Sequence, residues 1–471
     1  MRFSGVVAIV GALLGCVVGG AANPSEEWLA WFDPEQDGAI AVRPPEGTVP
    51  VTFDFGRKTV RIGERFYGIN CHPLPAAEAF RCPELVRELR PDSIRIMTNN
   101  RVFWAPGKKY EVELSPERGK FNWDSVDDLV RAIHAFGAEP YVAIGFGAPR
   151  WLNTSGATGK SRPLSADLPE LADYMAEVAG HLNRLECGLR YVTVDNEPEN
   201  VRYPFADYLA LFRDARPKLL AAAPGIRIAG PATGYACWTQ PDGSKLDFGG
   251  SLRMLRQENI PYDAIDWHVY STHPATILKT ADLVAETWPG TPRFLSEFNL
   301  DWRYTGAGGE RSQSNNTGWH SVRWLAAVWD GLQKRGVDRC YYFCLRNRYF
   351  GLYDYNLTET RPAYHLFRFF TGGLARQRVE ARSGHPAIGV VATVSPEGKR
   401  AAVIYNLADR PVPVSLAGWE VSALQSVLSE EWYRANRSIR EGRAAPIPEV
   451  PVDPGVELEI PAGGAVLLRQ R

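Results

Sequence analysis

The sequence lacks the arrangements of cysteine and histidine that bind structural metals. Seven cysteines and eight histidines are scattered over 471 residues, with no Cys-x-x-Cys pair and no cluster of the two residue types. Structural zinc sites need ligands at such short spacings. We therefore expect no metal site, and no motif indicates a cofactor.

An excess of charge of either sign is also missing. Lysine and arginine number 53, aspartate and glutamate number 54, and the formal net charge is −1. Nucleic acids are bound through basic surfaces, so this balance argues against a nucleic-acid partner. Fourteen tryptophans and nineteen tyrosines are many. Most should fill the core, but large rings also line sugar-binding clefts.

Long apolar runs are absent except near the first residue. Arg2 precedes VVAIVGALLGCVVGG, which is shorter and richer in small residues than a membrane-spanning helix. Residues 1–22 are therefore predicted to be a signal peptide of a secreted or periplasmic protein. Two processing routes stay open. One is cleavage after Ala22, and the other is lipidation of Cys16 in the lipobox-like LLGC, which would anchor an outer-surface lipoprotein in the membrane.

A glycine-rich phosphate turn is missing after the first predicted strand, which weakens the case for a doubly wound open sheet. The chain instead repeats a short apolar strand, a loop and a helical stretch. Eight strands are expected at 66–72, 93–97, 140–146, 191–197, 227–232, 264–270, 293–299 and 340–347. Helices are clearest at 124–137, 168–185, 206–222, 249–259, 319–336 and 361–373. This pattern predicts an α/β fold, the (β/α)8 TIM barrel.

The pattern changes after the last of these helices. Short alternating strands separated by proline, glycine and aspartate follow over 375–471, as in a small β-sandwich. The expected organisation is a lead-in or tether over 23–50, N-terminal strands over 51–65 that are candidates for the same sandwich, and a barrel over 66–374. The β-sandwich is then an accessory domain beside the barrel.

Two pairs of cysteines lie close together in the sequence. Cys71 and Cys82 flank a short loop and could pair in an oxidising compartment. Cys340 and Cys344 are four apart on a predicted strand, about 13 Å at ~3.3 Å per residue, which is too far for a disulfide. The sequence leaves open whether the first pair forms.

Two predicted strands carry carboxylates near their ends. VTVDNEPEN, residues 192–200, runs from apolar strand residues into an acidic, amide-rich cluster around Glu197, which strand interiors disfavour. The seventh strand, RFLSEFN, ends around Glu297. In a TIM barrel the active site lies at the carboxyl ends of the strands, and strands four and seven stand on opposite sides of the mouth. Two carboxyl groups facing each other across a sugar-sized gap are the arrangement used in glycoside hydrolysis.

Each motif alone has an ordinary explanation. Most surface glutamates only interact with solvent, and Glu297 could equally be a salt-bridge partner of Arg95. Both motifs together, on the fourth and seventh of eight strands, favour a pair of catalytic acids.

These motifs resemble a known group of enzymes. Asn196-Glu197 ending strand four and Glu297 ending strand seven look like the catalytic motifs of the clan A retaining glycoside hydrolases. SEFN with an aromatic-rich loop, the barrel-plus-sandwich layout and RPAYHLFRFF are similar to family 39, the β-xylosidases and α-L-iduronidases. The chain has Asp195 where family 39 usually has tryptophan, and its DNEP is similar to the xyloglucanase-type family 44. The resemblance implies that Glu197 is the general acid/base and Glu297 the ionised nucleophile about 5 Å away.

Other residues at strand ends are expected to bind or orient the sugar. Arg95 on strand two would point towards the nucleophile, as a clan pattern of arginine implies, and a structural ion pair is the alternative. His268 and Tyr270, in DWHVY, lie beside Glu297, where the tyrosine hydroxyl would hold its orientation. Asn196 could hydrogen-bond a hydroxyl beside the reacting carbon.

Further candidates line the predicted mouth. Asn70 and His72 end strand one and are candidates for binding sugar hydroxyls. Trp151, Trp238 and Trp302 lie on loops after strands three, five and seven. They are candidate stacking platforms, although loop tryptophans also pack as lids.

The end of strand eight differs from that of many clan members. Where those have a tryptophan platform after strand eight, this chain has CLRNR, and Arg346 is a candidate for the carboxylate of a uronate. The polar stretch 305–316 is expected to be a long loop, either a lid or an ordinary exposed insertion.

The sequence thus predicts an exported, retaining glycoside hydrolase whose partner is a carbohydrate. The expected substrate is a plant- or algal-type polysaccharide, or an oligosaccharide derived from it, cleaved in xylosidase-like fashion by two glutamates. An endo-glucanase or xyloglucanase-type hydrolase is the alternative among enzymes. A non-catalytic carbohydrate-binding barrel and a structural surface lipoprotein are the alternatives outside them.

Overall fold

The structure, a computed structural model, describes residues 42–303 and 306–471 with short gaps. The gaps are 73, 99–101, 106–107, 112, 146–147, 150, 153–164, 200–202, 235–237 and 240–244. The predicted signal peptide 1–22, its Cys16 and most of the 23–50 tether lie outside the described residues, and the first strand already begins at Val49. Among the described residues, no helix has the length and apolar character needed to cross a bilayer.

Eight parallel strands close into a barrel, which confirms the predicted fold class. Going around the barrel, the strands follow chain order and the last pairs with the first. They are β2 (Tyr67–Asn70), β3 (Ser93–Met97), β6 (Glu139–Ile144), β7 (Tyr191–Val194), β8 (Arg227–Thr233), β11 (Ala264–Tyr270), β12 (Arg293–Asn299) and β13 (Arg339–Tyr342). The rings of Tyr141, Phe294 and Tyr341 pack together inside the barrel. The part of the barrel that they occupy is therefore a filled core and not a pore.

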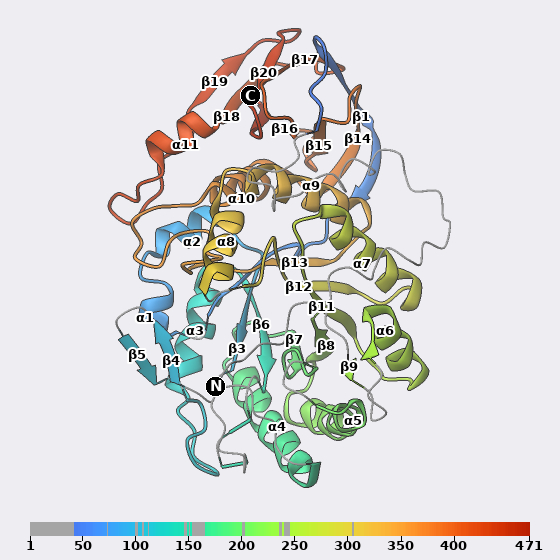
Figure 1. The fold of residues 1–471 in the computed structure, drawn as a ribbon, viewed down its shortest axis with the longest axis vertical. Helices are drawn as coiled ribbons and strands as arrows, with labels where there is room; N and C mark the ends of the chain where they lie inside the picture. Colours follow the sequence, from blue (N-terminus) through green and yellow to red (C-terminus); the bar gives the residue numbers. More distant parts are fainter. Residues whose placement is uncertain are drawn as a thin grey trace.

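Helices surround the barrel (Figure 1). Six match the apolar spacing of the sequence: α3 (Asp124–Ala135), α4 (Leu168–Arg184), α5 (Phe205–Ala222), α6 (Phe248–Gln257), α9 (Ser321–Lys334) and α10 (Pro362–Gly373). Others are additional: α1 (Ala76–Ala79), α2 (Pro83–Leu89), a 3-10 turn at Ser165–Asp167, α7 (Pro274–Thr287) and α8 (Gly306–Thr317). Two short hairpins extend the loops: β4 (Val102–Ala105) with β5 (Lys108–Glu111), and β9 (Trp238–Thr239) with β10 (Lys245–Leu246).

Helix α8 corrects the expectation that 305–316 is a loop. Its polar side chains are used internally, because the Asn316 side chain donates to the Asp301 backbone carbonyl (2.9 Å) and Asn315 donates to the Asp301 carboxylate (3.3 Å). Asn315 and Asn316 are buried. Tertiary hydrogen bonds therefore outweigh the low helix propensity of this segment.

The accessory β domain is one curled, nine-stranded sheet at the top of Figure 1. Its strands are β1 (Val49–Arg61), β14 (Gln377–Ser383), β15 (Ile388–Val394), β16 (Arg400–Asn406), β17 (Val412–Ala417), β18 (Ala423–Leu428), β19 (Glu449–Val452), β20 (Leu458–Ile460) and β21 (Ala465–Gln470), with helix α11 (Glu430–Asn436) inserted. Strand β1 pairs with β14 and with β17. The domain therefore combines a strand that precedes the barrel in the sequence with strands that follow it. The Asn406 side chain donates to Ile460 O across the curl (3.1 Å).

The two cysteines whose pairing the sequence leaves open are not bridged. Cys71 and Cys82 are both free thiols. Burial raises the pKa of Cys71 to about 12, so this thiol is neutral at physiological pH.

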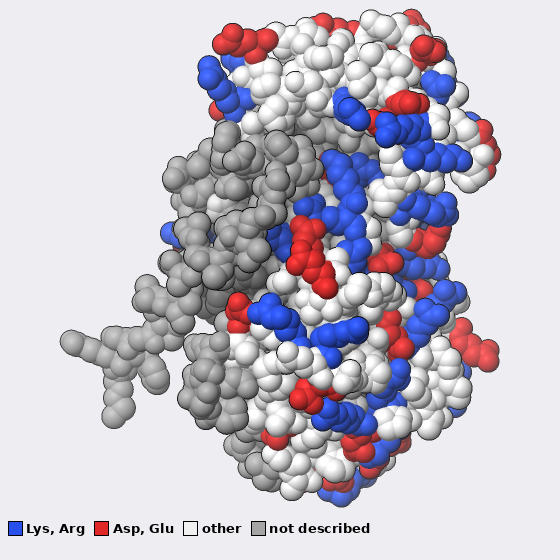
Figure 2. Space-filling model, turned by 90° about the vertical axis from the view of Figure 1, so that its right-hand side faces the viewer, with Lys and Arg blue, Asp and Glu red and all other residues white. Residues whose placement is uncertain are grey.

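Charges of both signs are interspersed on the described part of the face shown in Figure 2. This distribution agrees with a formal net charge of −1. A broad single-sign field, of the kind that steers a polyanion, does not dominate that face.

A buried charge network joins α9 to the β domain. Asp330 of α9 accepts hydrogen bonds from Arg378 of β14 (2.6 Å), Tyr405 of β16 (3.0 Å) and Lys334 (2.9 Å). Burial alone would raise the pKa of Asp330, but Lys334 and Arg378 outweigh it and hold the pKa below its ordinary value. The carboxylate is therefore charged in the folded protein and ties the two parts together.

We predict that Asp330→Asn destabilises the protein by about 3 kcal/mol at pH 7, because it leaves Arg378 buried without its counter-charge. Since the folded-state pKa is the lower one, the wild-type advantage is complete above about pH 4 and is lost as the pH falls below that value. Urea unfolding at several pH values measures this, with the exposed Asp453→Asn as control. Equal midpoints for both variants at pH 7 would contradict the prediction.

Candidate active site

Glu197 stands on a tight turn just beyond β7. Asp195 and Glu197 have left-handed backbone conformations, with φ of 65° and 49°, which cost non-glycine residues about 1 kcal/mol or more. Three hydrogen bonds hold the turn: Asp195 N–H donates to Ile144 O (2.7 Å), Asn196 N–H to Asp195 Oδ1 (2.7 Å) and Glu197 N–H to Ala232 O (2.9 Å). The strained turn sets the direction in which the Glu197 side chain leaves the backbone.

Glu297 lies in β12 at an irregularity of the strand. Consecutive side chains of a regular strand point to opposite faces. Here, however, Ser296 donates to Asp266 inside the barrel while Glu297 accepts from Arg95, also inside. The pairing register of β12 shifts at this point on both of its sides. A bulge of this kind re-aims side chains, and it brings Glu297 into the barrel interior.

Arg95, from β3, is the centre of the site and is fully buried. Its Nη1 donates to Glu297 Oε1 (2.7 Å) and to Asn70 Oδ1 (3.0 Å), while Nη2 donates to Asn196 Oδ1 and lies 3.4 Å from His268 Nε2. Burial alone would lower the pKa of Arg95, but the charge of Glu297 is the main effect that raises it above its ordinary value. Arg95 is therefore a fixed cation that joins residues of four barrel segments.

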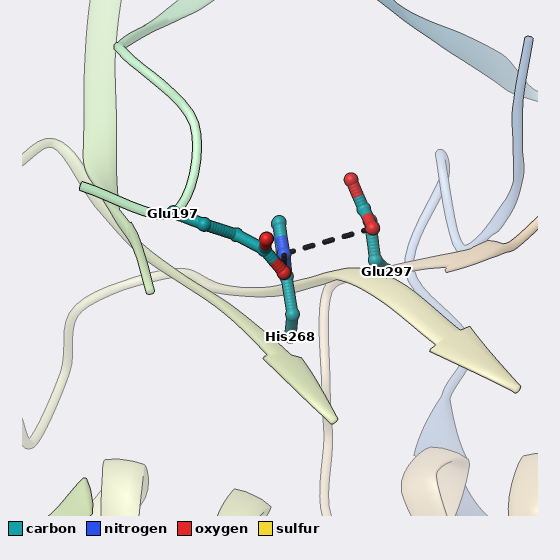
Figure 3. Close-up of side chains that lie close together, drawn as sticks. All are labelled: Glu197, His268 and Glu297. Atoms are coloured by element: carbon teal, nitrogen blue, oxygen red, sulfur yellow. Dashed lines mark hydrogen bonds and ion pairs between the residues drawn. The ribbon is translucent and has the colours of Figure 1, made fainter. Parts of the chain in front are cut away.

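His268 connects the two carboxylates. A guanidinium can only donate hydrogen bonds, so the contact with Arg95 makes Nε2 of His268 an acceptor and leaves the proton on Nδ1. That Nδ1 lies 3.2 Å from Glu197 Oε1 and 3.7 Å from Glu297 Oε2. Figure 3 shows the imidazole directed between the two glutamates.

Tyr270 completes the surroundings of Glu297. Its hydroxyl donates to Glu297 Oε2 (2.9 Å). Burial, and then the charges of Glu297 and Glu197, raise the pKa of Tyr270 well above its ordinary value, so the phenol keeps its proton. Both oxygens of Glu297 are thus held, one by Arg95 and the other by Tyr270.

The separation of the two carboxylates fits a specific chemistry. One oxygen each of Glu197 and Glu297 and a ring nitrogen of His268 lie within 4.8 Å of one another. Paired carboxyl groups about 5 Å apart serve nucleophilic attack on a sugar, while ~6.5–9.5 Å leaves room for a water. The same three residues could offer ligands to a cation, but the guanidinium of Arg95 touches two of them and would repel it.

Beneath the site lies a second polar group that the sequence analysis does not single out. Asp266 of β11 accepts hydrogen bonds from Tyr141 and Ser296. Burial raises the pKa of Asp266, against the opposing effect of the Arg95 charge. The sequence feature that could have indicated Asp266 is its spacing from His268. It lies two residues before His268 on the same strand, so both side chains point to the same face.

Asn70 is not available to a sugar, contrary to the prediction. Its Nδ2 donates to Ser296 O (2.8 Å) and Tyr341 O (3.3 Å), and its Oδ1 accepts from Arg95. The amide is buried and engaged at both ends. Asn70 therefore helps to hold the Arg95 guanidinium in place.

Arg346 does not face the mouth as a free cation. It is buried, donates to Tyr355 O (2.8 Å) and to the Glu78 backbone carbonyl, and is 3.5 Å from the Glu78 carboxylate. The prediction that it binds a uronate is therefore corrected, because these contacts connect the segment after β13 to helix α1.

Trp238 is also corrected. Only 1% of it is exposed, its Nε1 donates to Tyr203 O (3.2 Å), and it packs on Phe205 and Tyr208 of α5. An indole held in this way has no face left for a sugar.

Two of the remaining candidates, Trp302 and Trp151, keep accessible surface. Trp302, just after β12, is 63% exposed. Trp151 is half-buried, with its Nε1 donating to Ser115 Oγ (3.1 Å) and Arg118 over its ring. His72 lies at the end of β2 and contacts Asn347. For Trp302 and Trp151, stacking on a sugar stays a prediction.

Comparison with known proteins adds to this geometry. No protein-family model matches the chain, and no curated protein sequence does. Among solved structures, a GH39 β-xylosidase from Caulobacter crescentus is 17% identical with a TM-score of 0.65, over 89% of this chain and 99% of that one. A GH30 endoxylanase from Clostridium papyrosolvens C71 is 16% identical with a TM-score of 0.60, over 90% and 100%.

A third solved structure is the GH family 44 endoglucanase Cel44A from Clostridium thermocellum, 12% identical with a TM-score of 0.57 over 90% of this chain and 100% of that one. At these identities the likeness establishes the fold. It is the fold that the resemblance to clan A glycoside hydrolases implies, in the barrel and in the accessory β domain together.

We predict that Arg95→Gln destabilises the protein by about 3–5 kcal/mol, because it leaves a charged Glu297 buried without its partner. The double variant Arg95→Gln/Glu297→Gln should be more stable than Arg95→Gln alone, because the uncompensated negative charge of Glu297 is removed. Denaturant unfolding measures both, with Arg118→Gln at an exposed pair as control, expected within about 0.5 kcal/mol of wild type. A loss at Arg95 no larger than that of the control would refute the prediction.

Proposed function

We propose that this protein is a retaining glycoside hydrolase with Glu197 as general acid/base and Glu297 as nucleophile. The observation that carries the proposal is the approach of the two carboxylates within 4.8 Å, with His268 between them. A retaining mechanism requires this separation, because the nucleophile must reach the anomeric carbon while the acid reaches the leaving oxygen.

The unequal surroundings of the two glutamates support their roles. Arg95, Tyr270 and His268 all approach the oxygens of Glu297 with donors or positive charge, which suits a group that acts as an anion. The Glu197 side chain is 19% exposed, against 6% for Glu297. Access to solvent suits a group that exchanges its proton in every cycle.

The reaction has two steps. In the first, a Glu297 oxygen bonds to the anomeric carbon, the glycosidic C–O bond breaks, and Glu197 gives its proton to the leaving oxygen. In the second, Glu197 takes a proton from water, the water oxygen bonds to the anomeric carbon, and the bond to Glu297 breaks. The donors on Glu297 orient it for attack, and its negative charge stabilises the oxocarbenium-like transition state.

Xylose-type linkages of plant- or algal-type poly- and oligosaccharides are the substrate we propose. The names of the similar solved structures include a β-xylosidase and an endoxylanase. An endo-acting glucanase is the second candidate, favoured by Asp195 before Asn196-Glu197 and by the likeness to a family 44 endoglucanase. Cleavage of aryl β-xylosides and of xylo- and xyloglucan-oligosaccharides distinguishes the two.

We predict that Glu197→Gln lowers kcat/KM at least ~100-fold on substrates with poor leaving groups, and much less on activated aryl glycosides, which need little protonation. Azide should partly restore Glu197→Ala by attacking the glycosyl-enzyme. Glu431→Gln, an exposed site in the β domain, is the matched control and should keep full activity. If Glu197→Gln equals this control on every substrate, Glu197 is not the acid/base.

The stereochemical outcome tests the nucleophile. We expect proton NMR of 4-nitrophenyl β-xyloside hydrolysis to show β-xylose first, before mutarotation, because two displacements restore the configuration. First-formed α-xylose would rule out Glu297 as nucleophile. Oligosaccharide binding without cleavage of any aryl glycoside would favour the carbohydrate-binding barrel instead.

A further inference from the structure

Asn347 and His72 form a hydrogen-bonded pair beside the proposed catalytic residues. Asn347 follows β13 and His72 follows β2, and these two strands are neighbours in the barrel. The Asn347 Nδ2 lies 3.0 Å from His72 Nε2. His72 is also close enough to Glu297 for the carboxylate charge to act on it.

The orientation of the Asn347 amide is determined by its other contacts. Its Oδ1 accepts hydrogen bonds from the backbone N–H groups of Tyr349 (2.7 Å) and Phe350 (3.3 Å). Turning the amide over would place NH2 against two N–H donors, so the oxygen must face the backbone. The NH2 group therefore faces His72.

This orientation decides the protonation of His72. An amide NH2 can only donate, so Nε2 of His72 is the acceptor and carries no proton, which leaves the proton of the neutral ring on Nδ1. The ring also stands edge-on to Phe343, with centroids 5.3 Å apart. Burial acts in the same direction and lowers the pKa of His72 to about 4, although Glu297 opposes it.

We propose that Asn347 is a positioning residue that keeps His72 neutral, with its proton on Nδ1, so that Arg95 supplies the positive charge beside Glu297. The proposal rests on the proposed function, in which Glu297 attacks and positive charge develops on the sugar. A second cation near Glu297 would weaken the nucleophile and oppose that developing charge.

Three ionisable groups described near His72 are compatible with this assignment. Glu297, from β12, is the charged neighbour that acts directly on the ring. Cys71, adjacent in the chain, is a neutral thiol because burial raises its pKa to about 12. Arg346 acts on Cys71 but is held by Glu78 and Tyr355.

Asn347→Asp reverses the hydrogen bond without changing the size of the side chain. One carboxylate oxygen can still accept from the two backbone N–H groups, and the other then faces His72 Nε2 as an acceptor. The imidazole should respond by taking up a second proton. We expect the pKa of His72 to rise from about 4 to above 6.5.

The first test is nitrogen-15 NMR of the full chain labelled at its eight histidines, with His72→Gln to assign the signal. Wild type should show a neutral ring protonated on Nδ1 at both pH 6 and pH 7, and Asn347→Asp should show a cationic ring at pH 6. A wild-type ring that is protonated on Nε2, or cationic at pH 7, overturns the proposal, as does an unchanged pKa in folded Asn347→Asp. The wild-type measurement does not depend on how the variant folds.

The second test is the pH dependence of aryl glycoside cleavage. At pH 6, Asn347→Asp should lower kcat/KM by about tenfold or more, with partial recovery as the pH rises through the new His72 pKa. Asn356→Asp, an exposed site in the same region, adds the same charge and should retain the wild-type profile. A loss independent of pH, or one shared with Asn356→Asp, contradicts the role of Asn347.

The two tests separate this inference from the proposed function. If wild type cleaves no glycoside, the hydrolase assignment fails while the NMR result still stands. If wild type is active and its His72 is not the neutral Nδ1–H form, the inference about Asn347 fails alone.

Discussion

The site depends on one buried cation. The guanidinium of Arg95 contacts side chains from β2, the turn after β7, β11 and β12, which lie around the barrel. A guanidinium is planar and its donors have fixed directions. The position of Arg95 therefore fixes where the four contacting side chains lie relative to one another. Burying that charge is costly, and the cost is offset only while Glu297 and the amide oxygens remain in place.

The two glutamates near this cation differ in backbone geometry and in the contacts of their side chains. Glu297 is brought inward by a bulge and held through both oxygens, whereas Glu197 stands on a strained turn with part of its side chain in solvent. Backbone strain at Asp195 and Glu197 is tolerated because three hydrogen bonds over-determine the turn. The difference between the surroundings of the two glutamates therefore arises from backbone geometry as well as from charge.

Much of the fold could be predicted because its determinants are local. The strands 93–97, 264–270 and 293–299 appear with the bounds that their apolar residues indicate. Helix α8 was not predictable in this way, since buried contacts of Asn315 and Asn316 with Asp301 stabilise it. Apolar periodicity reports which face of an element is buried, and it carries no information about polar partners.

The sequence by itself determined the order of strands and helices, and it placed carboxylates near the ends of the fourth and seventh strands. The tertiary structure decided which polar groups are left for a ligand. Asn70, Arg346 and Trp238 have suitable chemistry, yet their groups are used by distant neighbours. The physical reason is that a polar group already hydrogen-bonded to a protein partner is not available to a ligand, and that partner can lie far away in the sequence. Arg95 and Glu297 are 202 residues apart, and His72 and Asn347 are 275 residues apart.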